Sequence, residues 1–142
     1  RSPLLVADGA HNVYSVESLL DSLPKYLEYD RLILVAGFSR DKNVRGMARA
    51  MLKKADVIYA TASRHPRSLT PAEVSGLFAE SREIVSEAPT PAEALKMALD
   101  TAGDKDLVLA TGSLFLTAEV RESALGIEPE IYPELPKLGS SA

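Results

Sequence analysis

The stretch Leu4-Leu5-Val6-Ala7-Asp8-Gly9-Ala10-His11-Asn12 places an acid, an imidazole and an amide directly after four apolar residues. Such a short apolar run is typical of a strand. In open α/β sheets, the loops that leave the carboxyl ends of the strands carry the groups that contact ligands. We therefore expect Asp8, His11 and Asn12 to lie at the ligand-binding edge of a sheet.

Short apolar runs alternate with helical patterns along the rest of the chain. Alternation with short connections predicts parallel strands joined by right-handed crossovers. The sequence thus predicts an α/β fold, a Rossmann-like, doubly wound, mostly parallel sheet with helices on both faces. The expected strands are Leu4–Ala7, Leu32–Ala36, Val57–Ala60, Glu83–Val85 and Leu107–Ala110, and the expected helices are 13–23, 44–54, 71–80, 91–101 and 114–124.

Two helix starts have almost the same sequence, Thr70-Pro71-Ala72-Glu73 and Thr90-Pro91-Ala92-Glu93. Each is expected to form a capping box, in which the threonine side chain accepts a backbone N–H and the glutamate reaches back. Proline at the first helical position fits the same interpretation. We attribute the likeness to shared helix-start chemistry and not to a sequence repeat.

The length of 142 residues and the hydrophobic content of 46% indicate one domain with a real core. We expect residues 1–125 to form this domain. Residues 126–142 are expected to be a proline-rich tail, because Pro129, Pro133 and Pro136 prevent a continuing helix.

The composition also excludes several classes of site. The chain has no cysteine, which excludes disulfides and thiolate metal sites. The longest apolar run, Leu32–Ala36, is far too short to span a bilayer, so we expect a cytoplasmic protein without a membrane partner. The start of the chain has neither an initiator methionine nor a signal segment, and we interpret the sequence as a piece of a longer protein.

The net charge of −4 hides a strong asymmetry. Residues 31–67 hold nine Lys or Arg and two Asp, a charge of +7 that leaves −11 for the remainder. In this segment Arg45, Arg49 and Lys53 recur every four residues and form one basic helix face, which suggests an anionic ligand or, alternatively, a merely solvated surface. No nucleic acid is expected, because there is no overall basic surplus and no interleaved aromatic side chains.

Polar clusters follow four of the predicted strands. Parallel strands would bring all four clusters to one edge, close enough to share a ligand. Asn12, Asn43 and either Thr111 or Ser113 are also good helix N-caps, and Gly112-Ser113 can offer N–H groups to a carboxylate or phosphate. The clusters are 8–12, Gly37–Asn43, Ser63–Arg67 and Thr111–Ser113.

Several kinds of chemistry lack their motifs. Asp8 and His11 supply too few ligands for zinc, so no metal site is expected. The sequence has no Gly-x-Ser-x-Gly elbow, no P-loop and no Gly-x-Gly-x-x-Gly fingerprint, so the chain does not hold a triphosphate by the usual means. A loop histidine bonded to backbone remains an alternative for His11, but a second loop histidine, His65, at the same edge favours function.

Four motifs stand in order along the chain: Asp8-Gly9-Ala10-His11-Asn12, Gly37–Lys42, His65-Pro66-Arg67, and Gly112-Ser113-Leu114-Phe115-Leu116 followed by Glu119-Val120-Arg121. In order and spacing they closely resemble the carboxy-terminal domain of bacterial folylpolyglutamate synthase, over nearly all of residues 4–125. The related Mur ligases share the fold and a variant of the first motif. The combination of motifs is more similar to the folate branch.

The resemblance implies an ATP-dependent acid–amino-acid ligase that adds L-glutamate to the terminal carboxylate of a folate through an acyl phosphate. A larger amino-terminal ATPase domain of the same polypeptide would carry the P-loop and the magnesium site. We accordingly expect a monomer, and a fragment that is inactive without that domain.

The resemblance also implies roles for residues on the nucleotide side. Asp8 would accept hydrogen bonds from the ATP ribose and His11 would lie beside the nucleotide, which makes both catalytic and cofactor-binding candidates. Asn12 is a third cofactor-binding candidate, although shaping the loop is its more natural role. A further arginine of the family is expected before Arg1.

On the glutamate side, Ser113 and the N–H groups behind Gly112 would hold a carboxylate of the incoming glutamate. Lys42, a catalytic candidate, or Arg67 would offset the charge of glutamate or phosphate. Asp41 would orient Lys42, or would cap the helix that follows.

Two alternatives remain open at this stage. The first is a Mur-type domain that adds an amino acid to a cell-wall precursor. The second is a free-standing α/β module that binds a small anion and has no ligase activity.

Overall fold

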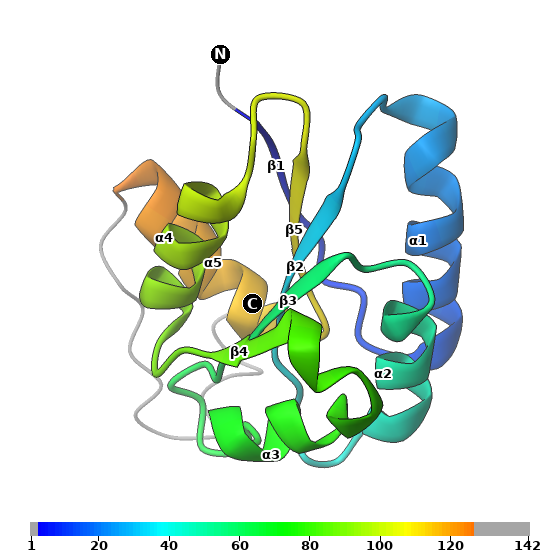
Figure 1. The fold of residues 1–142 in the computed structure, drawn as a ribbon. Coiled ribbons are helices and arrows are strands. Elements are labelled where there is room, and N and C mark those ends of the chain that lie inside the picture. The colour runs from blue at the N-terminus through cyan, green and yellow to red at the C-terminus, as the bar shows by residue number, and fades with distance from the viewer. Residues whose placement is uncertain (1–2, 127–142) are drawn as a thin grey trace, which may run out of the picture.

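A computed structural model describes residues 3–126 of the chain (Figure 1). Apart from Gly126, the predicted proline-rich tail lies outside the described residues. The elements are β1 (Leu4–Ala7), α1 (Val13–Tyr26), β2 (Leu32–Ala36), α2 (Val44–Leu52), β3 (Val57–Ala60), α3 (Pro71–Gly76), a 3₁₀ helix η1 (Ala79–Ile84), β4 (Val85–Glu87), α4 (Pro91–Thr101), β5 (Leu107–Thr111) and α5 (Leu114–Leu125).

The five strands form one sheet in the order β1-β5-β2-β3-β4, and all neighbouring strands are parallel. After β1 the chain builds β2, β3 and β4 outward and then returns to place β5 between β1 and β2 (Figure 1). Leu107 in β5 is in register with Leu4 on one side and Leu32 on the other. The predicted doubly wound α/β fold is confirmed.

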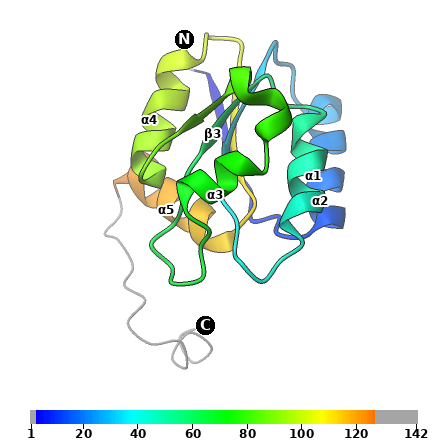
Figure 2. The same cartoon turned by 60° about the horizontal axis from the view of Figure 1, so that its bottom comes forward.

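Helices cover both faces of the sheet, with α1 and α2 on one face and α4 and α5 on the other (Figures 1 and 2). The side chains of strand β2 alternate between the two helical layers. Leu32, Leu34 and Ala36 pack with α1 and α2, whereas Ile33 and Val35 pack with α4 and α5. Because both faces are covered, all five residues are buried and the strand is apolar throughout.

The helices that follow neighbouring strands leave toward opposite faces. After β1 and β2 the chain turns to α1 and α2, but after β5, which lies between them, it turns to α5 on the other face. The loops therefore diverge at the carboxyl ends of these strands, at the bottom of Figure 1. Open α/β sheets bind their ligands at such a switch point.

Some predicted boundaries are wrong. Helix α1 continues through Pro24 to Tyr26, because the proline lies in the last turn and the N–H of Leu27 still bonds to Leu23 at 2.9 Å. The helix predicted over 71–80 ends at Gly76, a residue that stabilises helices poorly. Strand β4 is displaced by two residues to Val85–Glu87, α2 ends at Leu52 instead of residue 54, and β5 gains Thr111.

The two similar helix starts are not identical in structure. At Thr70 the full capping box forms, with the side chain of Thr70 accepting the N–H of Glu73 and the carboxylate of Glu73 accepting the N–H of Thr70. At Thr90 the hydroxyl accepts the N–H of Glu93 at 3.2 Å. Of these two starts, both inside residues 3–126, only that at Thr70 has the reciprocal bond, so the prediction for Thr90 is half right. None of the helices in this range is long and apolar enough to cross a membrane.

Asp106 ties together the amino-terminal edge of the sheet. Its buried carboxylate accepts the backbone N–H of Arg31 at 3.1 Å and that of Gly103 at 2.8 Å. It also accepts hydrogen bonds from Nε and Nη2 of Arg31, at 3.1 and 2.8 Å. The hydrogen bond from Arg31 is the main cause that holds the pKa of Asp106 below its ordinary value.

Replacing Asp106 by Asn is expected to lower the free energy of unfolding at pH 7 by about 2 kcal/mol, because the charged acceptor is lost. The folded-state pKa is the lower one, so this contribution is complete above the ordinary pKa of roughly 3.9 and disappears as the pH falls further. Urea unfolding at pH 7 and pH 3 measures it, with exposed Asp100→Asn as control. A difference between wild type and Asp106→Asn that does not shrink at pH 3 would contradict the prediction.

Candidate functional site

A cavity of about 160 Å³ opens at the carboxyl ends of the strands, the edge that faces forward in Figure 2. The loops after β1, β2, β3 and β5 all contribute to its walls. The prediction that the polar clusters meet at one edge is therefore confirmed. The lining residues are His11, Ser39, Asp41, Lys42, Arg67, Ser113, Leu114 and Phe115.

The loop after β1 is shaped by its own side chains. The Oδ1 atom of Asp8 accepts the N–H of Ala10 at 2.9 Å, and the Oδ1 atom of Asn12 accepts the N–H of Ser15 at 2.8 Å. Asn12 and Ser15 form a capping box at the start of α1. Asp8 and Asn12 are exposed and lie outside the lining of the 160 Å³ cavity. Asn12 thus has the loop-shaping role.

His11 lies in the β1 loop at the wall of the cavity. Its Nδ1 atom lies 2.9 Å from the carbonyl oxygen of Gly9. A carbonyl oxygen only accepts, so Nδ1 carries a proton and donates this hydrogen bond, while Nε2 is the ring nitrogen on the other side of the imidazole. The histidine is therefore bonded to backbone and also lines the cavity.

Ser113 lines the cavity where the chain leaves β5, whereas Gly112, predicted to bind substrate with it, is not among the lining residues. Gly112 has a φ of +115°, and its N–H donates to the carbonyl of Ala10 at 3.1 Å, which joins the β5 loop to the β1 loop. The buried Oγ atom of Ser113 accepts the N–H groups of Phe115 and Leu116 at 3.1 and 3.3 Å. Its hydroxyl proton remains able to donate to an anion at the positive end of α5.

Backbone hydrogen bonds join the loops after β2 and β3. The N–H of Arg40 donates to the carbonyl of Arg67 at 2.7 Å, and Ser39 and Ser68 form an isolated antiparallel bridge. This pairing places Asp41 beside Arg67, with 3.4 Å between Oδ2 and Nη1. The two loops therefore act as one unit at the mouth of the cavity.

Both predicted roles for Asp41 are wrong. Its carboxylate pairs with Arg67 and not with Lys42. The cap of α2 is Asn43, whose Oδ1 atom accepts the N–H of Gly46 at 3.1 Å. Asp41 still lines the cavity, where it partly offsets the positive charge of Arg67.

Two cations of the cavity are available to an anion. The side chains of Arg67 and Asp41 are each 51% exposed, and a pair of that kind contributes little in water. Among the described ion pairs none involves Lys42, which is exposed. The cavity therefore suits a small ligand that carries a carboxylate.

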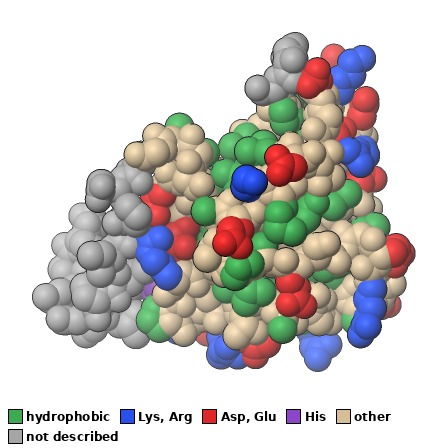
Figure 3. Space-filling view, turned by 60° about the vertical axis from the view of Figure 1, so that its left-hand side comes forward, with side chains coloured by type: hydrophobic (Ala, Val, Ile, Leu, Met, Phe, Trp, Pro, Cys, Tyr) green, Lys and Arg blue, Asp and Glu red, His purple; other side chains and the backbone are tan. Residues whose placement is uncertain are grey.

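The basic face of α2 is solvated, since Arg45, Arg49 and Lys53 are all exposed. On the side of the molecule where α4 lies, Figure 3 shows acidic and basic side chains scattered among apolar ones. The excess of positive charge lies in residues 31–67, which include α2 and the loop before it.

His65 is a residue of this edge to which the sequence assigned no role. His65 is 3% exposed, and its ring stacks on Phe115 with 3.8 Å between centroids and 16° between planes. Its Nδ1 atom accepts the N–H of Arg67 at 3.2 Å. Burial and the charge of Arg67 lower the pKa of His65, which favours the neutral ring that this acceptor requires.

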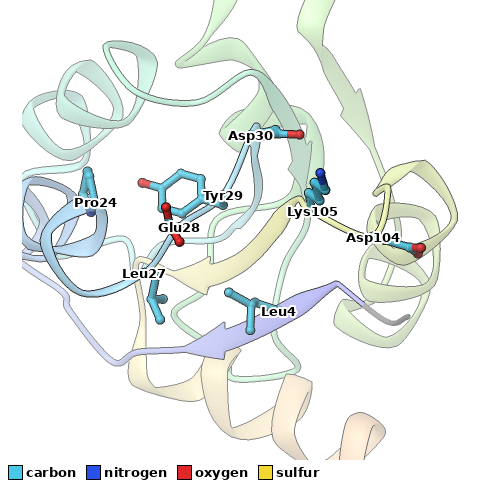
Figure 4. Close-up of a pocket in the computed structure, with 8 residues that line it drawn as sticks. All are labelled: Leu4, Pro24, Leu27, Glu28, Tyr29, Asp30, Asp104 and Lys105. Carbon is cyan, nitrogen blue, oxygen red and sulfur yellow. The ribbon is translucent and has the colours of Figure 1, made fainter.

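A larger cavity of about 740 Å³ lies at the opposite, amino-terminal edge (Figure 4). No predicted site residue lines it, and open parallel sheets bind ligands at the other edge. Its residues come from β1, the end of α1 and the loops before β2 and β5. They are Leu4, Pro24, Leu27, Glu28, Tyr29, Asp30, Asp104 and Lys105.

The chain is similar to known ligases. It is 33% identical to the folylpolyglutamate synthase of Lacticaseibacillus casei over 126 residues, which cover 88% of this chain and 28% of that relative. E. coli FolC in complex with ADP shows 25% identity and a TM-score of 0.80, over 89% of this chain and 30% of that chain.

A bifunctional folylpolyglutamate synthase/dihydrofolate synthase from Yersinia pestis, complexed with AMPPNP and a Mn ion, shows 25% identity and a TM-score of 0.73, over 87% of this chain and 29% of that chain. The chain thus spans less than a third of the length of these relatives. Residues 1–114 match the family described as Mur ligase, glutamate ligase domain. The chain belongs to this family of Mur ligase glutamate ligase domains.

Proposed function

We propose that this chain is the C-terminal, glutamate-binding part of an ATP-dependent folylpolyglutamate synthase, which adds L-glutamate to the terminal carboxylate of a folate. The observation that carries the proposal is the cavity that His11, Lys42, Arg67 and Ser113 line together. The names of the similar proteins support the same activity.

The size and charge of the cavity support an amino acid as its ligand. Its volume of about 160 Å³ is below the range of roughly 300–1,000 Å³ that drug-sized ligands occupy. The Ser113 hydroxyl, at the positive end of α5, holds one carboxylate of L-glutamate. Lys42 and Arg67 offset the negative charge of the amino acid and of the phosphate that is released.

The nucleotide contacts this domain at the β1 loop. Asp8 is exposed and uses Oδ1 for the N–H of Ala10, so its second carboxylate oxygen can accept a hydrogen bond from the ATP ribose. His11, which bonds the carbonyl of Gly9 through Nδ1, lies beside the nucleotide and contacts it through Nε2. Within residues 3–126 no three His, Asp or Glu side chains lie close enough to hold a metal ion. We propose that magnesium and the triphosphate are bound by an amino-terminal ATPase domain of the same polypeptide, and that the protein acts as a monomer.

The chemistry explains why two domains are needed. ATP phosphorylates the folate carboxylate, the amine of L-glutamate attacks the acyl phosphate, and an amide and phosphate are released. This domain places the amine beside the reacting carbon, which converts a bimolecular step into an effectively unimolecular one. Its closure over the other domain keeps water from the acyl phosphate.

The test is ATP-dependent addition of L-glutamate to a folate by the full-length protein, run beside this chain alone. We expect product from the full-length protein and none from the chain alone. A full-length protein that is folded but inactive on folates refutes the proposal. The same assay with a cell-wall precursor as acceptor then tests a Mur-type activity.

A further inference from the structure

A buried carboxylate on α5 binds the loop after β3 and has no part in the function proposed above. The side chain of Glu119 is 8% exposed. Its Oε2 atom accepts the backbone N–H of Arg64 at 2.7 Å, and Oε1 lies 3.4 Å from Nη1 of the same arginine. Burial raises the pKa of Glu119, while the N–H and the charge of Arg64 oppose that rise.

The neighbouring turn of α5 reinforces this anchor. The carboxylate of Glu122 accepts hydrogen bonds from Nη1 and Nη2 of Arg64 at 3.1 Å each, a bidentate arrangement that fixes the plane of the guanidinium. Glu119 and Glu122 are three residues apart and therefore share a helix face. Phe115, four residues before Glu119, lies on the same face and stacks on His65.

The loop that this face holds ends at the cavity. Glu119 binds the backbone N–H of Arg64, and the next residue, His65, stacks on Phe115. The Nδ1 atom of His65 in turn accepts the N–H of Arg67. Arg67 lines the cavity together with Ser113, the N-cap of the same helix. Helix α5 thus carries Ser113, the proposed carboxylate-binding residue, at its start. On its side it carries the residues that fix the loop of Arg67, a cation of the same cavity.

We propose that Glu119 and His65 are positioning residues for the amino-acid substrate, which hold Arg67 at the distance from Ser113 that a bound glutamate requires. The inference rests on the proposed function. Neither residue touches the substrate, so both act on its affinity and leave the nucleotide contacts of the β1 loop unchanged.

The experiment compares variants of the full-length protein by their KM for L-glutamate, KM for ATP and kcat. Glu119→Leu leaves the N–H of Arg64 without its acceptor, and we expect the KM for L-glutamate to rise about tenfold. The KM for ATP and kcat are expected to stay within about twofold of wild type. Glu119→Gln keeps an acceptor oxygen, so its KM for L-glutamate is expected to rise by no more than about threefold.

Two further variants make the result specific. Ser123→Leu puts the same leucine at an exposed position of the same helix and is expected to behave as wild type. His65→Phe keeps a ring on Phe115 but cannot accept the N–H of Arg67, so it tests the second contact even if Glu119→Leu does not fold. We expect His65→Phe to raise the KM for L-glutamate and not that for ATP.

The outcomes separate the two proposals. A wild-type protein that adds no glutamate to folate refutes the proposed function and this inference with it. If the wild-type protein is active and both Glu119→Leu and His65→Phe leave the KM for L-glutamate unchanged, the inference alone is overturned. A parallel rise of both KM values, or an equal effect of Ser123→Leu, also overturns it, since a general loss of structure would produce either result.

Discussion

Replacing Gly112 by alanine is expected to destabilise the domain by about 3–5 kcal/mol, a large part of the total stability of a small domain. The φ of +115° is strained for any residue with a Cβ. An added Cβ would also lie 2.3 Å from the carbonyl oxygen of Gly37 and 3.1 Å from two ring carbons of Phe38. Urea unfolding of the 142-residue chain, followed by circular dichroism, measures the loss.

Two other glycines separate strain from close contact. Gly126 has a φ of +69° and open space around a Cβ, so Gly126→Ala is expected to cost about 1 kcal/mol through strain alone. Gly76 lies in α3 in open space without a positive φ, and Gly76→Ala is expected to be neutral or to stabilise by up to about 1 kcal/mol. If Gly112→Ala lowers the free energy of unfolding no more than Gly126→Ala does, the contact with Gly37 is not rigid and our interpretation of this turn is wrong.

His11→Ala in the full-length protein is expected to lower kcat/KM by about 100-fold, the scale on which one positioned imidazole or hydrogen-bonding group acts. His11 is the only side chain of the β1 loop that lines the described cavity. Its contacts are local, to Gly9 and Ser15, so the midpoint of thermal unfolding should change little. Steady-state kinetics and a thermal melt on the same preparation measure both effects.

His11→Asn is the matched control. An asparagine amide can donate to the carbonyl of Gly9 as Nδ1 does, but it has no atom in the place of Nε2. An activity as low as that of His11→Ala assigns the function to Nε2. Wild-type activity in His11→Asn would instead show that the histidine only shapes the loop, and the proposed contact with the nucleotide would be lost.

The fold was predictable because most strands are buried on both faces. Strands β2 and β3 have the predicted bounds, since Leu32–Ala36 and Val57–Ala60 are uninterrupted apolar runs. Strand β4 is an edge strand that pairs only with β3 in the described sheet, and Ser86 and Glu87 are exposed. The hydrophobic pattern does not indicate where such an exposed strand begins and ends, so the predicted strand lies two residues too early in the sequence.

The candidate site was predictable as a set of loops but not as a set of contacts. The rule that ligands bind at the carboxyl ends of parallel strands selects the loops of His11, Lys42 and Ser113. The pairing of Asp41 with Arg67 depends on hydrogen bonds between two loops that are distant in sequence. No local pattern reveals such a bond.

Buried polar residues were the hardest part of the site to predict. The sequence shows that Glu119 is an acid on a helix, but only packing shows that the loop after β3 covers it. His65 was visible as a second loop histidine, and the neighbouring Pro66 and Arg67 were the one available signal. Its stacking on Phe115 follows from the tertiary structure.

The place of β5 in the sheet has a consequence for how the protein is made. Of the five described strands β1 is translated first, yet in the described sheet it pairs only with β5, in register from Leu4↔Leu107. At a synthesis rate of roughly 5–20 residues per second, β1 waits on the order of 5 to 20 seconds for its partner. The loop of Asp8 and His11 is thus among the first parts of the site to be translated and among the last to be fixed in place.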